Sequence, residues 1–450
     1  MKPLKSACAL LGSLALLSAG RAFAEEPASG SSFDVPGVES GAEPNAGQTL
    51  RADPAPDTED HVFEYWLRDG RELVSLRSKI GAARFDVATA ALWPNPSLSV
   101  SGGYLLSGEA VNGVSSIGPQ LTFPLPVFGQ IAGRKDEARA NLAVAQVEVL
   151  SEIWDRAGDV EDAMVERAFS DAEVREVERN LGELDRISRV IAVRASAGAN
   201  SVYDTLRVST TEATFRAALA SAMTGRDRAE AKLVSLIAVP GLRSAPVTRD
   251  GLSGFRGPEN EAALQNLARQ RRPDLELARR GITAARASAD RFRREVIPIP
   301  SVSIGPYFTH SPSSVSLQGT ISLPLPTFDR NQGLIGRALV EANGQQALAE
   351  TIEQRIAVEV HGAWLARERA RQALATFRDG GLKSTDDLLA RAEVSYQAGS
   401  FAILDLLDAF RAVWEARAQE LELEKAFAQA EAELEHAAVV LPISVKSRNR

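Results

Sequence analysis

The feature that most constrains this chain is a junction between a strand pattern and a helix pattern that occurs twice. Residues 121–128 read Leu-Thr-Phe-Pro-Leu-Pro-Val-Phe, and residues 321–328 read Ile-Ser-Leu-Pro-Leu-Pro-Thr-Phe. In each copy, alternating apolar and polar residues run into Pro-x-Pro and an aromatic residue, and a long Ala-rich helical pattern follows. A repeat spacing of 200 residues indicates two copies of a whole module, because solenoid repeats are far shorter.

The first 60 residues read as an export signal and a leader. Lys2 and Lys5 precede an apolar run too short to span a membrane as a helix, and Ala22-Phe23-Ala24 is a small-x-small cleavage site, so residues 1–24 are the predicted signal. Residues 25–60 are rich in Gly, Pro, Ser, Glu and Asp, which predicts an extended or disordered segment. The single cysteine, Cys8, lies inside the signal, so we expect no disulfide or thiolate metal site in the exported chain.

The net charge of the chain bears on which kind of molecule it binds. The formal net charge is −8, and the predicted signal carries no acidic residue, so its removal makes the chain more acidic still. An acidic chain argues against nucleic acid as a partner, which requires a basic face. Because no run of about 18 apolar residues follows the signal, we expect the exported chain either to be free in the periplasm or to cross an outer membrane as strands.

The periodicity places the same elements in both modules. Helical patterns over about 62–92 and 259–296 each precede two strands, and each pair of strands precedes two long helices. The predicted first repeat (61–239) has strands at 96–106 and 115–126 and a helical hairpin at 132–239. A connector (240–258) leads to the second repeat (259–441), which has strands at 300–309 and 315–326 and a hairpin at 332–440. Residues 442–450 are a tail. In the second hairpin, one helix is expected from about 332 to 397, with Gly399 ending it.

The four strands have one apolar face and one face of Ser, Thr, Gln and Gly. In a soluble sandwich, the apolar face would need a second sheet, which four strands of about ten residues do not supply. Strands of this length and pattern fit a membrane barrel with a wet lumen. Four strands do not close a barrel, so the barrel must be shared between subunits, as a dimer of eight strands or a trimer of twelve; a lumen lined by small residues favours twelve.

The two helical hairpins are expected to continue such a barrel as a helical tube. Their abundant Ala allows close packing, and residues Val174, Val177, Leu181, Leu184 and Ile191 keep a near-heptad seam. The many charged residues of these helices suit a tube whose inner and outer surfaces both contact water. The alternative is a coiled-coil scaffold with no passage through it.

Several motifs together resemble the TolC-type outer-membrane efflux proteins, over about residues 60–441. The resemblance rests on Arg272-Pro273-Asp274-Leu275, Ile282-x-Ala284-Ala285-Arg286, Pro300-Ser301-Val302-Ser303, the run from Leu323 to Gly333, and Tyr396, Gly399, Asp405, Leu407 and Asp408. The Phe-Asp-Arg-Asn-Gln-Gly run at 328–333 looks most like the cobalt–zinc–cadmium branch. One departure is Gly70-Arg71-Glu72-Leu73, where the family usually has Asn-Pro-x-Leu, so the pattern does not define the start of the first helix.

This resemblance implies a mostly α fold with β strands, built from a duplicated module of one helix, two strands and two long helices. It implies a homotrimer with a twelve-stranded outer-membrane barrel, a periplasmic helical barrel, and an equatorial region at mid-length. It also implies docking to a periplasmic membrane-fusion adaptor and an inner-membrane RND pump. Most of the chain is then expected in the periplasm of a Gram-negative cell.

By the same resemblance, Asp405 and Asp408 ring the closed periplasmic tip. A carboxylate from each subunit at two heights of a narrow pore would favour cations, whereas the simpler alternative is two solvated carboxylates at a helix start. We expect Asp204 to hydrogen-bond Tyr396 and hold the tip shut, and Arg207 to add an inter-helix pair.

Two other groups of residues are expected to define levels along the molecule. The tip turns, where an adaptor would make contact, are Gly198, Ala199 and Asn200 in the first module and Gly399, Ser400 and Phe401 in the second. The strand-to-helix junctions, where the lipid-facing barrel would become a water-bathed tube, are Pro124, Pro126, Phe128, Pro324, Pro326 and Phe328. Proline suits a place where the strand ladder ends, because its missing N–H costs little there.

The sequence shows no motif typical of catalysis or of metal binding. The four histidines (His61, His310, His361 and His436) have no ligand spacing, and neither a phosphate loop nor a nucleophile elbow is present. We therefore expect no cofactor, no metal site and no enzymatic activity. The predicted function is an exit duct for divalent heavy-metal cations; the alternatives are the same duct for drugs or other organic solutes, and a periplasmic coiled-coil adaptor or scaffold.

Overall fold

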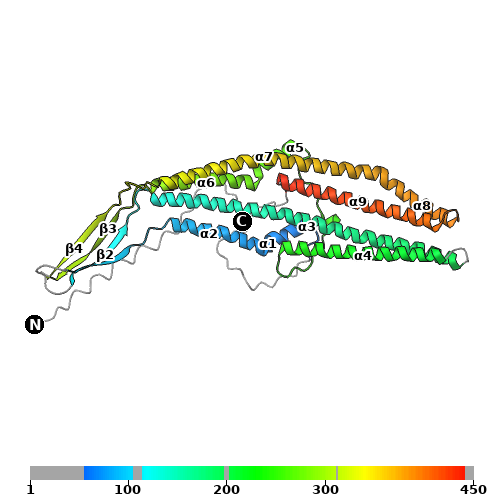
Figure 1. Cartoon of the computed structure of the whole chain (residues 1–450), viewed down its shortest axis with the longest axis horizontal. Helices are drawn as coiled ribbons and strands as arrows, with labels where there is room; N and C mark the ends of the chain where they lie inside the picture. Colours follow the sequence, from blue (N-terminus) through cyan, green and yellow to red (C-terminus); the bar gives the residue numbers. More distant parts are fainter. Residues whose placement is uncertain (1–54, 105–113, 197–201, 311–312, 441–450) are drawn as a thin grey trace, which may run out of the picture. The chain divides into compact units, whose positions relative to one another are not determined.

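We describe the fold from a computed structural model, which defines residues 55–104, 114–196, 202–310 and 313–440. It contains long helices and one small antiparallel sheet (Figure 1). The strands are β1 (Ser97–Tyr104), β2 (Val114–Pro124), β3 (Ser301–His310) and β4 (Ser313–Ser322), and they lie in the order β1-β2-β3-β4. The central pair, β2 and β3, comes from different modules and sets Leu121 opposite Ile304. The sheet therefore joins the two repeats.

The two faces of the sheet differ as the alternating pattern predicts. Its apolar side chains point outward and are exposed, for example Leu98 (71%) and Ile321 (79%). On the other face, the hydroxyls of Thr122 and Ser303 are hydrogen-bonded at 2.9 Å across β2 and β3, and Ser303 is buried. The strands approach closely here: a Cβ at Gly305 would lie 2.0 Å from the carbonyl oxygen of Pro119, so the position requires glycine.

The described part of the first module contains four helices. They are α1 (Glu59–Asp69), α2 (Arg71–Ala90), α3 (Gln130–Ser196) and α4 (Val202–Ile237). The single helix expected over 62–92 is thus two helices. Gly70 separates them because its ψ of 116° is outside the helical region. Its site is also crowded, since a Cβ there would lie 2.6 Å from the carbonyl oxygen of Trp66.

The second module has more breaks than the sequence pattern predicts. The connector carries the 3₁₀ turn η1 (Arg249–Gly251). The described helical elements of the second module are α5 (Glu261–Arg271), α6 (Pro273–Arg294), α7 (Gln332–Phe377), the π-helical turn η2 (Arg378–Leu382), α8 (Lys383–Gln397) and α9 (Ile403–Ala438). The helix expected over 259–296 is wrong as one element. Arg272 precedes a proline and takes an extended ψ of 120°, so α5 ends there and Pro273 begins α6. The helix expected over 332–397 is likewise interrupted, by η2.

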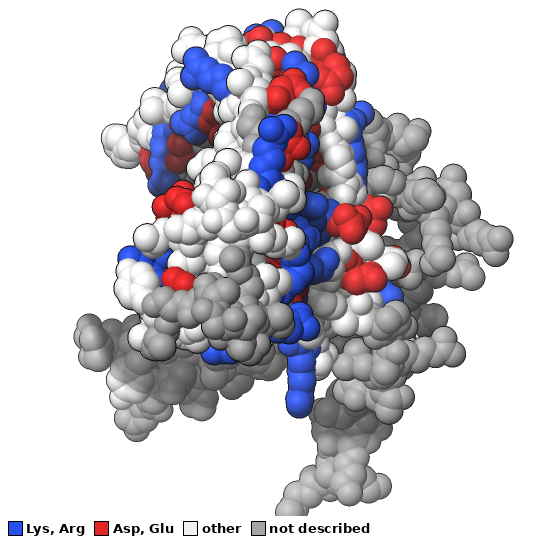
Figure 2. All heavy atoms as spheres, turned by 90° about the vertical axis from the view of Figure 1, so that its right-hand side faces the viewer, with Lys and Arg blue, Asp and Glu red and all other residues white. Residues whose placement is uncertain are grey.

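Helix α3 packs against α2, α4, α6 and α9, while α7 packs against α5, α6 and α9. The near-heptad seam of α3 is confirmed at four of its five positions: Val174, Val177, Leu184 and Ile191 are buried, and Leu181 is half-buried against them. None of the described helices combines the length and apolarity needed to cross a membrane. Seen from the side on which α8 ends in Figure 1, basic and acidic side chains lie next to one another on the surface (Figure 2).

Candidate functional site

Asp405 and Asp408 lie in the first turns of α9, one turn apart and both exposed. Asp405 accepts a hydrogen bond from the backbone N–H of Ala402 at 2.9 Å, so it satisfies one of the orphan donors at the helix start. Asp408 is 74% exposed and faces Arg411 on the same helix at 4.0 Å. Between them, Leu406 and Leu407 are buried. The packing of these leucines therefore turns both carboxylates toward solvent on one face of α9.

A tight turn joins α8 to α9. Gly399 has a φ of +79°, and the N–H of Ser400 donates to the carbonyl of Ser395, a bond typical of a helix ended by a left-handed glycine. Phe401, in the same turn, is 44% exposed. The corresponding turn of the first module, Gly198, Ala199 and Asn200, lies outside the described residues.

Tyr396 is 4% exposed and belongs to a cluster of buried side chains from α3, α4, α8 and α9. Within this cluster, Phe215 of α4 packs edge-on against Phe410 of α9, with ring centroids 5.5 Å apart. Asp204 and Arg207 lie in the first two turns of α4. Arg207 donates through Nε to the hydroxyl of Tyr203, one turn earlier in the same helix, at 2.9 Å. The hydrogen bond between Asp204 and Tyr396 remains a prediction.

An ion pair that the sequence did not indicate lies next to Tyr396. Arg186 of α3 donates to Glu393 of α8, and Glu183 binds the same guanidinium at 3.0 Å. The hydrogen bonds to Glu393 and Glu183 raise the pKa of Arg186, so its guanidinium stays protonated. Arg186 and Glu393 are 207 residues apart in sequence, and the pair links the hairpins of the two modules.

The strand-to-helix junctions share one geometry. In each Pro-x-Pro segment the second proline is the central residue of a three-residue turn: Val127 N–H bonds Leu125 O at 2.8 Å, and Thr327 N–H bonds Leu325 O at 2.9 Å. Pro126 is buried, whereas Phe328 is 94% exposed. The residues that follow determine where each helix begins; the sequence pattern marked 328–333 as a family motif but did not predict this role.

In both junctions, a residue with positive φ directly precedes a glutamine at the start of the helix. These residues are Gly129 (φ +84°) before Gln130, and Asn331 (φ +56°) before Gln332. Gln130 donates to the carbonyl of Ile297, just beyond α6, at 2.9 Å. Asn331 donates to the carbonyl of Phe292, in the last turn of α6, at 3.1 Å. Each long helix is thereby tied at its start to the end of α6.

The described residues contain no cluster of three or more His, Cys, Asp or Glu side chains arranged to hold a metal ion. His61 and His361 each face one carboxylate, Asp57 and Glu261 respectively. His436 instead stacks on Trp154, with centroids 4.1 Å apart, and burial lowers the pKa of its imidazole.

Comparison with known proteins identifies the family. A family model described as "Outer membrane efflux protein" matches residues 67–239 and 264–438, one span in each module. The chain belongs to this family. The cobalt-zinc-cadmium resistance protein CzcC of Cupriavidus metallidurans is 26% identical to this efflux protein over 334 residues, covering 72% of this chain and 76% of CzcC.

Two solved structures show the same fold. A crystal structure of CusC matches with a TM-score of 0.67 at 20% identity, covering 87% of this chain and 95% of that chain. The open state of the MtrE outer membrane channel of Neisseria gonorrhoeae matches with a TM-score of 0.66 at 19% identity, covering 85% and 89% of the two chains. The predicted resemblance and the mostly helical fold with an antiparallel sheet are confirmed. This efflux protein is an outer membrane efflux channel of the TolC and CzcC type, and its family is one of channels rather than enzymes.

Proposed function

We propose that this efflux protein is the outer-membrane exit duct of a tripartite, RND-type efflux system that exports divalent heavy-metal cations. The observation that carries the proposal is the pair of exposed carboxylates, Asp405 and Asp408, one turn apart on α9 in a homologue of a cobalt-zinc-cadmium resistance protein. Repeated around a narrow pore, such a pair forms two rings of negative charge, which favour cations.

The proposed assembly is a homotrimer with a twelve-stranded barrel. The sheet has two outer strands, β1 and β4, and an unpaired edge in lipid costs several kcal/mol for each backbone group. The exposed apolar face of the sheet supports a lipid-facing role. Three copies paired edge to edge, β4 of one with β1 of the next, remove every edge.

The periplasmic end of this duct is the tip formed by the helical hairpins. Asp204, Tyr396 and Arg207 hold it closed, and the turns that include Ser400 and Phe401 contact a membrane-fusion adaptor, which connects the duct to an RND pump. The pump supplies the energy for transport. The junction prolines, Pro124 and Pro126 with Pro324 and Pro326, mark the level at which the barrel passes into the helical tube.

Single-channel recording in planar bilayers tests the duct. We expect discrete, cation-selective conductance from the purified protein, and a larger conductance after Asp405→Ala together with Asp408→Ala. If neither the native protein nor this double variant conducts, the chain is not a duct, and a periplasmic scaffold takes its place.

Growth tests determine the cargo. A deletion strain of the native host should become more sensitive to cobalt, zinc, cadmium or nickel salts, and a plasmid copy of the gene should restore resistance. A strain that keeps its metal resistance but becomes sensitive to detergents, dyes or antibiotics would assign the duct to organic solutes instead.

A further inference from the structure

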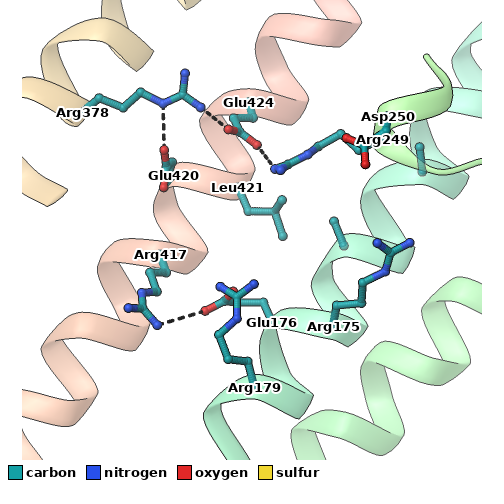
Figure 3. Close-up of a pocket in the computed structure, with 12 residues that line it drawn as sticks. Arg175, Glu176, Arg179, Arg249, Asp250, Arg378, Arg417, Glu420, Leu421 and Glu424 are labelled. Carbon is teal, nitrogen blue, oxygen red and sulfur yellow. Dashed lines mark hydrogen bonds and ion pairs between the residues drawn. The ribbon is translucent and has the colours of Figure 1, made fainter. Parts of the chain in front are cut away.

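A cavity of about 490 Å³ lies between α3, α9, η1 and η2 (Figure 3). Five arginines from these four elements line it: Arg175, Arg179, Arg249, Arg378 and Arg417. Sites for small ligands typically have volumes of about 300–1,000 Å³, so the space is large enough for one.

The acidic and basic side chains around the cavity differ in their exposure to solvent. The carboxylates that pair with the arginines are mostly buried against the helices, with exposed fractions of 13% for Glu176, 20% for Glu420 and 16% for Glu424. The arginine side chains are more exposed, at 57%, 60%, 50%, 48% and 28% for Arg175, Arg179, Arg249, Arg378 and Arg417. Asp250 of η1 is the exposed carboxylate of the lining. The formal charges nearly balance, but a solute that enters the cavity meets five guanidiniums that are more exposed than the paired carboxylates of Glu176, Glu420 and Glu424.

The ion pairs hold these guanidiniums in place. Arg378 donates to Glu420 at 2.7 Å and also to Glu424, and Arg249 of the connector donates to Glu424 as well. These hydrogen bonds and nearby charges raise the pKa of Arg378. A guanidinium whose orientation is already held by a buried carboxylate loses less entropy when it binds a second anion.

Two arginines of α3 have donors turned to the open space. Arg175 donates through Nη2 to Asp171, and Arg179 donates through Nη1 to Glu176 at 2.8 Å. Each guanidinium has five N–H donors in a planar fork. Figure 3 shows both side chains extending from α3 toward the cavity, where the other donors of the fork can meet the oxygens of an anion.

We propose that this cavity binds a small polyanion carrying two or more phosphate or carboxylate groups. Paired oxygens on such groups match the planar donors of arginine, and several groups on one molecule allow it to meet arginines of different elements. The apolar residues of the lining are Leu421 and two alanines, so the cavity offers no large apolar surface to a hydrophobic or aromatic ligand.

A bound polyanion would join four separate parts of the chain. Among the described residues, η2 is the segment with π-helical geometry, a form frequently found at functional sites and helix bends. Arg378 is its first residue, and Arg249 belongs to the connector between the two modules. The ligand would neutralise arginines on η2, η1, α3 and α9 together, and so restrain the bend between α7 and α8.

The test is isothermal titration of the purified full-length protein in detergent with two probes, inorganic pyrophosphate and citrate, in buffer without other multivalent anions. The first variant is Arg175→Gln with Arg179→Gln, and the second is Arg249→Gln. The matched control is Arg216→Gln, an exposed arginine of α4 that pairs with Glu212 within its own helix.

We expect saturable binding of at least one probe to the native protein and the control, and binding at least about tenfold weaker in the double variant, equal to 1.4 kcal/mol. Preference for pyrophosphate assigns phosphate groups, and preference for citrate assigns carboxylates. The proposal fails if neither probe saturates the native protein, or if the variants, shown by circular dichroism to be folded, bind as tightly as the control. It holds whatever cargo the duct carries, so metal-resistance assays do not affect it.

Discussion

Arg186 of α3 and Glu393 of α8 form an ion pair between the two helical hairpins, one helical turn before Tyr396. The side chain of Arg186 is 49% exposed and that of Glu393 is 19% exposed, so the pair lies at the edge of the buried cluster around Tyr396. A link between helices of different modules resists their separation.

The first prediction is that Arg186→Ala makes the tip easier to open. A partly exposed ion pair contributes up to about 1 kcal/mol, which corresponds to about a fivefold change in the ratio of open to closed channels. The measurement is open probability in planar bilayers. Arg216→Ala, which removes a pair within one helix, should leave the open probability unchanged. Equal behaviour of Arg186→Ala and the native protein would show that this pair does not restrain the tip.

The second prediction separates the two aspartates of α9. Asp405→Ala removes the acceptor for the N–H of Ala402 and should lower the free energy of unfolding by about 1 kcal/mol, whereas Asp405→Asn keeps an acceptor and should cost less. Asp408→Asn should leave stability unchanged, because Asp408 is 74% exposed.

Both asparagine variants should reduce cation selectivity, measured as the reversal potential across a salt gradient. If the double asparagine variant keeps the native cation selectivity, these carboxylates are solvated groups at the start of the helix and do not determine selectivity.

The sequence predicted those parts of the fold that depend on local periodicity. Alternation placed the strands to within a few residues, and the heptad spacing of α3 identified side chains that are buried. Breaks in helices were predicted less well. Arg272-Pro273 supported the family resemblance but was not interpreted as a helix end, and η2 has the pair Gly380-Gly381, which periodicity alone does not distinguish from tolerated helical glycines.

For the candidate site, the sequence predicted features that depend on spacing within one helix but not contacts between the two modules. Residues three apart on a helix share a face, so the joint exposure of Asp405 and Asp408 follows from their spacing. The pair of Arg186 with Glu393 depends on how two helices from separate modules are rotated against each other, and no short-range pattern contains that information. The arginine cavity has the same origin, because its lining comes from four separated elements.

The third prediction concerns a buried carboxylate of α3. Glu161 is 6% exposed, and its Oε2 has no hydrogen-bond partner among the residues that the structure describes. Burial, together with the nearby carboxylates of Glu435, Glu59 and Asp162, raises the pKa of Glu161 well above its ordinary value, an effect only partly opposed by Arg256. Burial likewise raises the pKa of Glu435 to about 6.

A raised carboxyl pKa means that the folded state binds protons more tightly than the unfolded chain. The associated stability is therefore complete below the ordinary pKa and is lost as pH rises through the folded value. Between about pH 4.5 and 6, the step due to Glu435 alone should be about 2 kcal/mol, and Glu161 should extend the loss to higher pH.

Glu161→Gln should flatten this dependence and raise the melting temperature at pH 8. The measurement is thermal unfolding in detergent from pH 5 to 8, with the exposed neighbour variant Glu433→Gln as control. A melting temperature that is lower than that of the native protein at every pH would contradict the prediction.

The fourth prediction tests the junction at the start of α7. Asn331 has a left-handed backbone with φ +56°, a region that costs most residues about 1–2 kcal/mol and glycine very little. Its side chain also donates to the carbonyl of Phe292, a bond worth about 1 kcal/mol. Asn331→Gly loses the bond alone, whereas Asn331→Val loses the bond and adds backbone strain. The valine variant should therefore lower the free energy of unfolding by at least about 1 kcal/mol more than the glycine variant.

Gln130→Ala is the matched change in the first module, where Gln130 is 1% exposed and binds the carbonyl of Ile297. Denaturant unfolding of the three single variants, and of Gln130→Ala combined with Asn331→Gly, measures the effect. If both junctions hold α6 as one unit, the loss in the double variant will differ from the sum of the two single losses by more than about 0.5 kcal/mol. Equal destabilisation by glycine and valine at position 331 would show that the left-handed conformation does not constrain this residue, and the helix start would then depend on the hydrogen bond to α6 alone.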